Sequence, residues 1–381
     1  MTTRATIGRM TRWSALALLA FAGVASAAPV RGQVETTSSR WSGDMIVTDI
    51  VVRAADGTRT TIVEHGGSVD GVGMWVSHRD ATLKPGDEVE VTHDRYRMRA
   101  HRVGASAQSI ARSDEDPSHA NGVAGPGVQR TSRSQRALYH PTACLNFQYD
   151  AKGSTKIDSE WSAFDAAFTA WEGASANHAC GGVSLSGTLV QNAPDGHDGI
   201  NTIHFRDTKW CRPSNGSEAE TCHSPDAVAV TRVLYVDEPF SPRDGEILEV
   251  DIDVNAVDFT FGPSAIDLQS AATHEIGHAL GLDHNCGVED GAWPSDRDGQ
   301  PVPSCESVSA DLANATMYVQ VQPGSTTMRA PKPSDVDGLC SSVGGTCIAE
   351  VTGGCSTSGG SSGGLVVVLA ALLWRRRRAT T

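Results

Sequence analysis

Apolar residues recur at helical spacing in two segments of the C-terminal two thirds of the chain. One segment carries the stripe Leu268, Ala272, Ile276 and Ala279. The other, between residues 159 and 172, carries Phe164, Phe168 and Trp171. Residues three or four positions apart share one face of a helix, so each segment predicts a helix with one packed face. Ser264 and Asp267, three positions apart after Pro263, resemble a capping box that starts the helix with Leu268.

Short β-branched runs surround these helices and predict a sheet on which the aromatic helix packs. The runs cover residues 145–149, 183–186, 202–205, 227–236 and 247–254. Alternating apolar and polar runs also fill the N-terminal part of the chain, with turn signals such as Asp56-Gly57 and Pro85-Gly86 between them. They cover residues 45–52, 59–64, 72–76, 88–92 and 96–103. This second group predicts a small β-barrel or sandwich domain over residues 28–104.

Between the two groups, residues 105–135 are rich in Ser, Gly, Arg and Asp, which is typical of a linker. We therefore expect the larger domain to span residues 136–350. Arg130, Arg133 and Arg136 make the end of the linker basic. We expect this end to be exposed to proteases; the alternative is a solvated spacer that is not cleaved. The β domain is then either an accessory module or a removed pro-region.

Both ends of the chain carry export signals. Residues 1–27 hold Arg4, Arg9 and Arg12 before an apolar run and Ala25-Ser26-Ala27, which predicts a cleavable signal peptide. Residues 351–381 contain the apolar run 365–374, followed by four arginines. This tail resembles a MYXO-CTERM sorting signal, which implies a bacterial envelope protein whose tail is removed; a retained C-terminal anchor is the alternative.

The segment 273–284 holds a candidate metal site. His274 and His278 are four residues apart, so on a helix both imidazoles leave the same face, with Glu275 beside them. Gly281 can adopt the left-handed conformation that ends the helix and delivers His284 as third ligand. Three protein ligands leave one coordination position open, as in catalytic zinc sites. We predict one zinc ion, with Glu275 as the base that accepts a proton from its bound water.

The sequence HEIGHALGLDH is similar to the HExxHxxGxxH signature of the metzincin metalloendopeptidases. Met317, followed at once by Tyr318, resembles the methionine turn of the matrixins and implies that Met317 lies below the zinc and that Tyr318 is not a ligand. The resemblance implies an α+β catalytic domain, with a first helix, a twisted mixed sheet with one antiparallel edge strand, and then the zinc helix. Ser334 resembles the N-cap of the family's C-terminal helix. Asp198-Gly199 and His204 match the family's structural-zinc loop too little to assign a second zinc.

The nine cysteines of an exported chain predict disulfides. By proximity we pair Cys211 with Cys222, Cys286 with Cys305, Cys340 with Cys347, and Cys144 with Cys180. The first cysteine is Cys144, so no thiolate in the N-terminal region can block a zinc ion. The net charge of −14 excludes nucleic acid as a partner. Bound Ca²⁺ would suit this acidity, but the acids are too scattered to assign its ligands.

Together these features predict a secreted or surface-displayed zinc endopeptidase, a metalloprotease acting on protein or peptide substrates. One alternative is a surface adhesion protein with a vestigial metzincin domain, but the retention of Glu275 and all three histidines argues against it. The other alternative is a zinc hydrolase of a non-peptide bond. The sequence places the wall of the specificity pocket near residues 318–323 and sets neither cleavage specificity nor oligomeric state.

Overall fold

A computed structural model describes residues 30–42, 45–77, 83, 85–93, 98–102, 128–176, 182–214, 220–287 and 302–342. The predicted signal peptide, residues 105–127 of the predicted linker, and the predicted C-terminal tail lie outside the described residues. Within the described part of the chain, no helix is long and apolar enough to cross a membrane.

A seven-stranded mixed sheet forms the centre of the molecule, with strand order β4-β5-β13-β14-β10-β8-β9. Its strands are β4 (Gly67–Val69), β5 (Val72–Val76), β8 (Cys144–Asp150), β9 (Ser184–Val190), β10 (Asn201–Arg206), β13 (Ala229–Val236) and β14 (Ile247–Asn255). Strands β14, β10, β8 and β9 run parallel, whereas β13 is antiparallel to β14. The prediction of an α+β fold with a mixed sheet is confirmed.

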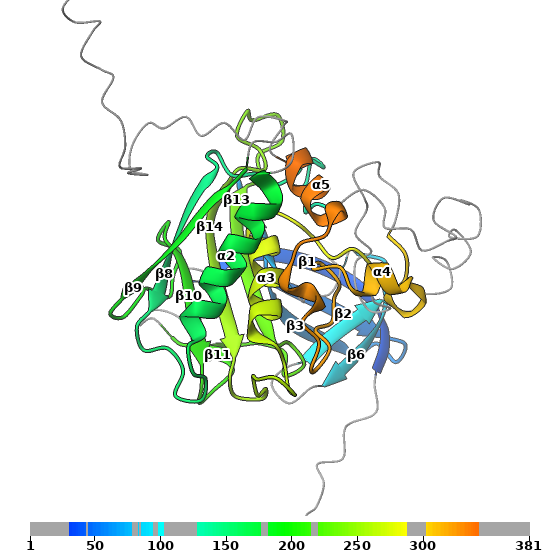
Figure 1. The fold of residues 1–381 in the computed structure, drawn as a ribbon. Coiled ribbons are helices and arrows are strands. Elements are labelled where there is room, and N and C mark those ends of the chain that lie inside the picture. The colour runs from blue at the N-terminus through cyan, green and yellow to red at the C-terminus, as the bar shows by residue number, and fades with distance from the viewer. Residues whose placement is uncertain are drawn as a thin grey trace, which may run out of the picture.

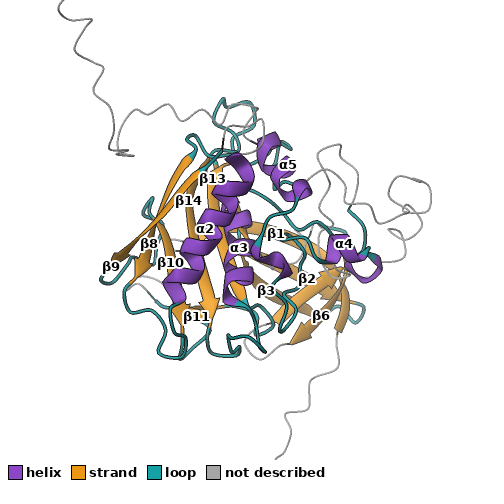
Figure 2. Cartoon of the chain, in the orientation of Figure 1, coloured by secondary structure: helices purple, strands orange, loops and turns teal. Residues whose placement is uncertain are grey.

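Two helices, α2 (Glu160–Ala176) and α3 (Leu268–Ala279), lie side by side on one face of this sheet (Figures 1 and 2). Phe164, Phe168 and Trp171 of α2 are buried in the main core, as their helical spacing predicts. The indole nitrogen of Trp171 donates a 2.8 Å hydrogen bond to the carbonyl of Thr273, which ties α2 directly to α3. The aromatic stripe therefore fixes the position of the helix that carries the histidines.

A second sheet is built from N-terminal strands, all antiparallel, in the order β3-β2-β1-β6-β7. Its strands are β1 (Val30–Ser42), β2 (Met45–Ala54), β3 (Arg59–His65), β6 (Glu88–His93) and β7 (Met98–Arg102). The short pair β11 (Cys211–Arg212) and β12 (Thr221–Cys222) forms a separate ribbon. The remaining elements are η1 (Cys305–Ser307), α4 (Ala310–Ala313), η2 (Thr327–Arg329) and α5 (Pro333–Ser342).

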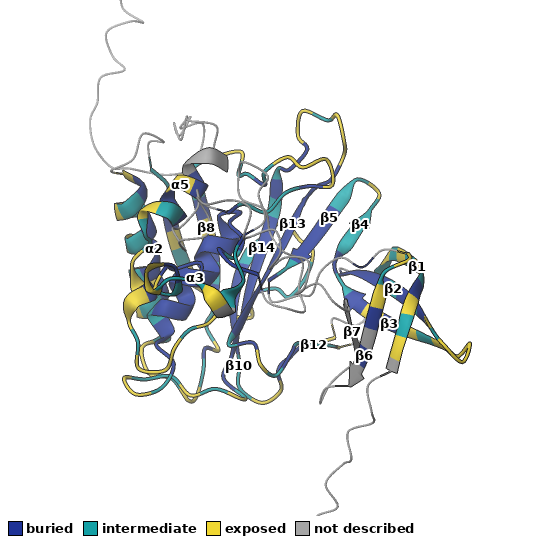
Figure 3. Cartoon of the chain, turned by 90° about the vertical axis from the view of Figure 1, so that its right-hand side faces the viewer, coloured by how far each residue is buried: buried dark blue, intermediate teal, exposed yellow. Residues whose placement is uncertain are grey.

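The N-terminal strands do not all stay in the small sheet. Strands β4 and β5 extend the large sheet beyond β13, and Figure 3 shows them between β13 and the small sheet. Met45, Ile46 and Val47 of β2 form one buried cluster with Met74 and Leu234. A self-contained all-β domain is therefore not confirmed, because its third predicted strand pairs with the larger domain.

Residues 128–132 pack against the large domain, whereas residues 133–136 are exposed, as expected for Arg133 and Arg136. The amide of Arg130 donates to the carbonyl of Gly281, and its guanidinium lies 3.4 Å from Asp283. The Ser132 hydroxyl donates to Asp244, and the amide of Arg133 donates to Asp237. Serine, glutamine and arginine side chains signal a solvated linker, but here they satisfy carboxylates and carbonyls of the large domain.

His140 binds the C-terminal end of α3 and makes the stability of the folded protein depend on pH. The ring donates from Nε2 to the carbonyl of Ala279 at 2.8 Å, and burial lowers the pKa of His140 to about 4. The unfolded chain, with a histidine pKa of about 6.5, binds a proton more readily than the folded chain. Stability should therefore fall as the pH falls from about 6.5 towards 4.

We expect His140→Gln, which keeps an N–H donor but cannot titrate, to lose less stability than the parent between pH 7 and pH 5. The measurement is the denaturant midpoint of both proteins at the two pH values, with the shared titration of all other groups cancelling in the difference. Equal losses in the two proteins would contradict this role for His140.

Candidate metal centre and active site

Helix α3 begins one turn later than the sequence pattern suggests. Its N-cap is Asp267, not Ser264, and the Asp267 carboxylate accepts a 2.9 Å hydrogen bond from the Ser270 amide. The guanidinium of Arg329 binds the same carboxylate and lowers the pKa of Asp267, although burial opposes this effect. An ionised carboxylate at a helix N-terminus accepts an otherwise unpaired N–H group and complements the helix dipole.

The helix ends at the glycine that the sequence singled out. Gly281 has φ of +91°, and the amide of Leu282 donates to the carbonyl of Gly277 at 3.0 Å. This arrangement satisfies a carbonyl of the last turn while the chain reverses. A Cβ at Gly281 would lie 2.9 Å from the carbonyl oxygen of Leu138, so a side chain has no room there. The reversal brings His284 back beside the helix.

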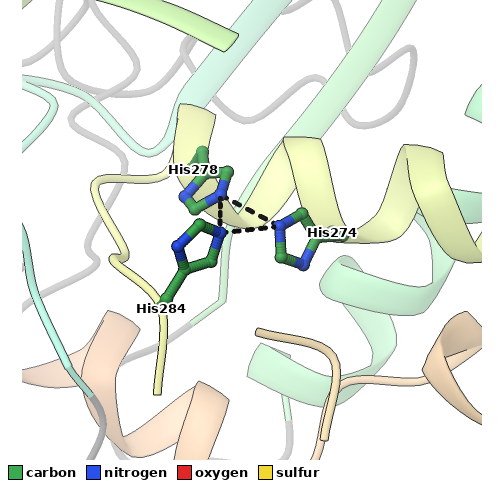
Figure 4. Close-up of side chains that lie close together, drawn as sticks. All are labelled: His274, His278 and His284. Carbon is green, nitrogen blue, oxygen red and sulfur yellow. Dashed lines mark hydrogen bonds between the residues drawn. The ribbon is translucent and has the colours of Figure 1, made fainter. Parts of the chain in front are cut away.

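The three histidines converge (Figure 4). Their Nε2 atoms are 3.0 Å apart between His274 and His278, 3.2 Å between His278 and His284, and 3.3 Å between His274 and His284. His274 and His278 are buried, and His284 is partly buried. The three nitrogens form one group able to hold a metal ion.

The other ring nitrogens set the tautomers. Nδ1 of His274 donates to the carbonyl of Thr316 at 2.7 Å, and Nδ1 of His278 donates to the carbonyl of Leu282 at 2.9 Å. With the proton on Nδ1, each Nε2 presents a lone pair to the centre. Tetrahedral zinc with Zn–N bonds of about 2.05 Å sets its ligand nitrogens about 3.4 Å apart. The observed triangle is close to that size, so these residues fit zinc.

The segment that carries Met317 holds the first of the three histidines. Thr316, whose carbonyl accepts from His274, donates its own amide to the Asp335 carboxylate at 3.1 Å. Asp335 is buried at the start of α5 and also accepts from the amide of Lys332, and burial raises the pKa of Asp335 above its ordinary value. Helix α5 begins at Pro333, so Ser334 lies inside its first turn and is not the N-cap.

Met317 lies against helix α3, beside Gly277. It is buried in the main core, and a Cβ at Gly277 would overlap its sulfur. The Tyr318 hydroxyl donates a 3.2 Å hydrogen bond to the carbonyl of Cys305.

Glu275 is buried and faces strand β13. Its Oε2 accepts from the Thr231 hydroxyl at 2.6 Å and from the Ser77 hydroxyl at 3.3 Å. Thr231 belongs to β13, whereas Ser77 directly follows β5. Neither hydroxyl was predicted as a site residue, because no local pattern links them to a glutamate 44 or 198 positions away.

A cavity of about 350 Å³ opens beside His274 and Glu275. Its other walls include residues 226–228 just before β13, the helix residue Ala271, and the segment 319–323. The sequence placed a specificity wall near residues 318–323, and this segment lines the cavity.

Other clusters of charged residues are internally paired. Arg206 binds Asp195 and Asp253, and Arg232 binds Glu249 and Asp251. Burial raises the pKa of Glu249 to about 7, with Asp251 adding to the effect. These carboxylates therefore pair with arginines. His204, 3.0 Å from the carbonyl of Pro194, lies in this network.

Two predicted disulfides are confirmed, Cys211 with Cys222 and Cys286 with Cys305. The Cys286–Cys305 disulfide joins the chain just after His284 to the start of η1. The Cys211–Cys222 disulfide joins β11 to β12. The other two pairings involve Cys180 and Cys347, which lie outside the described residues.

Among the comparisons with known proteins, one family model covers the segment that holds the histidines. The family model for matrixins matches residues 184–290, which hold all three histidines and Glu275. A search of curated protein sequences finds no match. One of the solved structures that match is the crystal structure of metalloproteinase-II from Bacteroides fragilis, at 11% identity, covering 80% of this chain and 92% of that chain with a TM-score of 0.26. The matrixin match supports a metallopeptidase.

Removing one ligand should abolish metal binding. We expect His278→Ala to lose zinc, because two histidines remain where a catalytic site needs three protein ligands. Metal analysis of the folded protein measures this, with His197→Ala, which alters an imidazole stacked on Trp41 outside the triad, as the control. Stoichiometric zinc in the His278→Ala protein would count against the site.

The floor of the site should tolerate a change of shape but not of volume. We expect Met317→Leu to keep zinc and to cost less than about 1.5 kcal/mol in the free energy of unfolding. Gly277→Ala should cost more, about 1–3 kcal/mol, because its methyl group overlaps the Met317 sulfur. Denaturant unfolding and metal analysis test both variants, and loss of zinc from Met317→Leu would show that the sulfur does more than fill space.

Proposed function

We propose that the chain is an exported zinc endopeptidase in which His274, His278 and His284 bind the metal and Glu275 is the general base. The observation that carries the proposal is the convergence of three Nε2 atoms within 3.0–3.3 Å, with Glu275 adjacent. Zinc bound there would lower the pKa of a coordinated water to about 7 and polarise the scissile carbonyl. An exported location is supported by the predicted signal peptide and by the two disulfides.

The protein's own residues supply substrate binding and proton transfer. An extended peptide can pair with an antiparallel strand at the side of the sheet next to Glu275, which is the place of β13. The side chain that follows the scissile bond then enters the cavity between Ala271 and residues 319–323. Glu275 accepts a proton from the attacking water and passes it to the leaving nitrogen of the peptide.

Thr231 orients that base. Its hydroxyl donates to Oε2 of Glu275 at 2.6 Å and holds the carboxylate towards the sheet. A hydrogen bond to an ionised carboxylate favours the charged form, which is the form able to accept a proton. Because Glu275 is buried, this orientation is maintained away from competing solvent.

The proposal is tested by separating metal binding from proton transfer. We expect Glu275→Ala to keep stoichiometric zinc and to lose activity on an unfolded, fluorescently labelled protein by at least about 100-fold, since general-base catalysis contributes about 10²–10⁴-fold. The exposed glutamate Glu220, which pairs with Lys209, provides the control as Glu220→Ala.

Both variants and the parent are compared either all as uncut chains or all after the same cut in the chain, and each is assayed with and without a chelator. Activity of Glu275→Ala within tenfold of the parent would remove Glu275 from this role. Activity in the parent that a chelator leaves unchanged would contradict the zinc peptidase itself.

A further inference from the structure

Strand β5 covers the edge at which a peptide substrate would pair. Its five residues lie antiparallel to β13, with Val72 opposite Val236 and Val76 opposite Arg232. Without β5, the backbone groups of β13 on that side would be free to bind an extended chain. The N-terminal region therefore occupies the peptide-binding edge of the proposed enzyme.

The strand also runs towards the catalytic base. The amide of Ser77 donates to the carbonyl of Thr231 at 2.8 Å, and the amide of Thr231 donates to the Ser77 hydroxyl oxygen at 2.7 Å. The same hydroxyl donates to Oε2 of Glu275. Ser77 is 1% exposed, so it fills the space beside the base.

Trp75 closes the site from the side of the second ligand. Its ring meets the His278 ring edge to face, with centroids 5.0 Å apart. The guanidinium of Arg130 lies 5.4 Å from the Trp75 ring. Trp75 is 7% exposed and belongs to the main core, so it lies buried between His278 and Arg130.

The small sheet anchors this strand. Met74 packs with Met45, Ile46 and Val47 of β2, and the carbonyl of Ile46 accepts from the amide of Gly66 just before β4. At the other end, the amide of Asp237 donates to the carbonyl of Gly71. β5 is thus held from both sides while it covers β13.

We infer that β5 is an intramolecular inhibitor, and that the uncut chain is latent because this strand occupies the substrate edge and Ser77 covers Glu275. This inference rests on the proposed peptidase function. It assigns latency to strand pairing, in a region that contains no cysteine to act as a metal ligand. Activation then requires β5 to leave β13.

The position of residues 128–138 limits where the chain is cut. The amide of Leu138 donates a hydrogen bond to the carbonyl of Arg130. The amide of Arg130 donates a hydrogen bond to the carbonyl of Gly281, which lies near His284 in the chain. A cut between Arg130 and Arg136, which the sequence suggested, would break this contact. The active form should therefore begin at or before Val128.

A size change at Gly73 tests the inference in the full-length chain. Gly73 lies opposite Tyr235, and a side chain at Gly73 would overlap the tyrosine ring. Gly73→Val should therefore weaken the pairing of β5 with β13. We expect the uncut variant to be at least about ten times as active as the uncut parent. Overpacking disfavours the state in which β5 pairs with β13, and a shift of this size follows from its cost.

The matched control lies at the other edge of the same sheet. A side chain at Gly187 would overlap the ring of Tyr149, so Gly187→Val applies the same strain far from β5. It should not raise activity. The double variant Gly73→Val with Tyr235→Ala swaps large and small residues across the strand pair and should return activity towards that of the parent.

Amide hydrogen exchange gives a readout independent of activity. The amides of residues 72–76 should exchange faster in zinc-loaded Gly73→Val than in the parent and in Gly187→Val. Terminal sequencing of the active form from culture fluid gives its first residue.

Several outcomes would overturn the inference. One is an uncut parent as active as the cut form. Another is faster exchange of β5 in Gly73→Val without a rise in activity, while the cut parent is active. An active form that begins after Arg130 would contradict the position of the cut. If zinc-loaded parent is inactive in both cut and uncut forms, the peptidase proposal fails and this inference fails with it.

Discussion

Three imidazole nitrogens lie within 3.3 Å of one another, and the carbonyls bound to His274 and His278 leave two of these nitrogens unprotonated, so they repel unless a cation lies between them. The surrounding structure is arranged to hold this otherwise unfavourable group. Helix α3 provides two rings at a spacing of four, Gly281 turns the chain so that it provides the third, and two carbonyls fix the tautomers. The Asp335 carboxylate holds the peptide of Thr316, which in turn holds His274, so α5 contributes to the site without touching it.

A second constraint concerns the end of the sheet. The parallel strands β9, β8, β10 and β14 place their helices on one face, and antiparallel β13 completes the sheet beside Glu275. An open edge at that position is required for peptide binding, yet an open edge also pairs readily with any other strand. In this chain the N-terminal strand β5 satisfies the edge. In the proposed enzyme, substrate recognition and inhibition would thus use the same backbone hydrogen-bonding groups of β13.

Local patterns predicted the elements that depend on local spacing. The zinc helix, the aromatic helix, the five central strands and the triad follow from periodicities of two, three and four residues. Long-range pairing leaves no such signal: Trp75 lies opposite Val233 and next to His278, about 150 to 200 positions along the chain. The cap was misplaced for a related reason, since Ser264 and Asp267 can both cap a helix locally, whereas the contact that holds Asp267 comes from Arg329, 62 positions away.

The burial of Trp75 decides how latency can be relieved. A tryptophan side chain buries about 150–250 Å², and at about 25 cal/mol per Å² its exposure costs about 4–6 kcal/mol. Spontaneous release of β5 would therefore populate an open state in about one molecule in 1,000 or fewer. While the chain is intact, the released strand also stays at a high effective concentration and rebinds. A cut in the chain removes this tether, and the N-terminal strands can then dissociate and dilute. In the proposed enzyme, proteolysis before Val128 would therefore relieve latency without requiring any change at the three histidines.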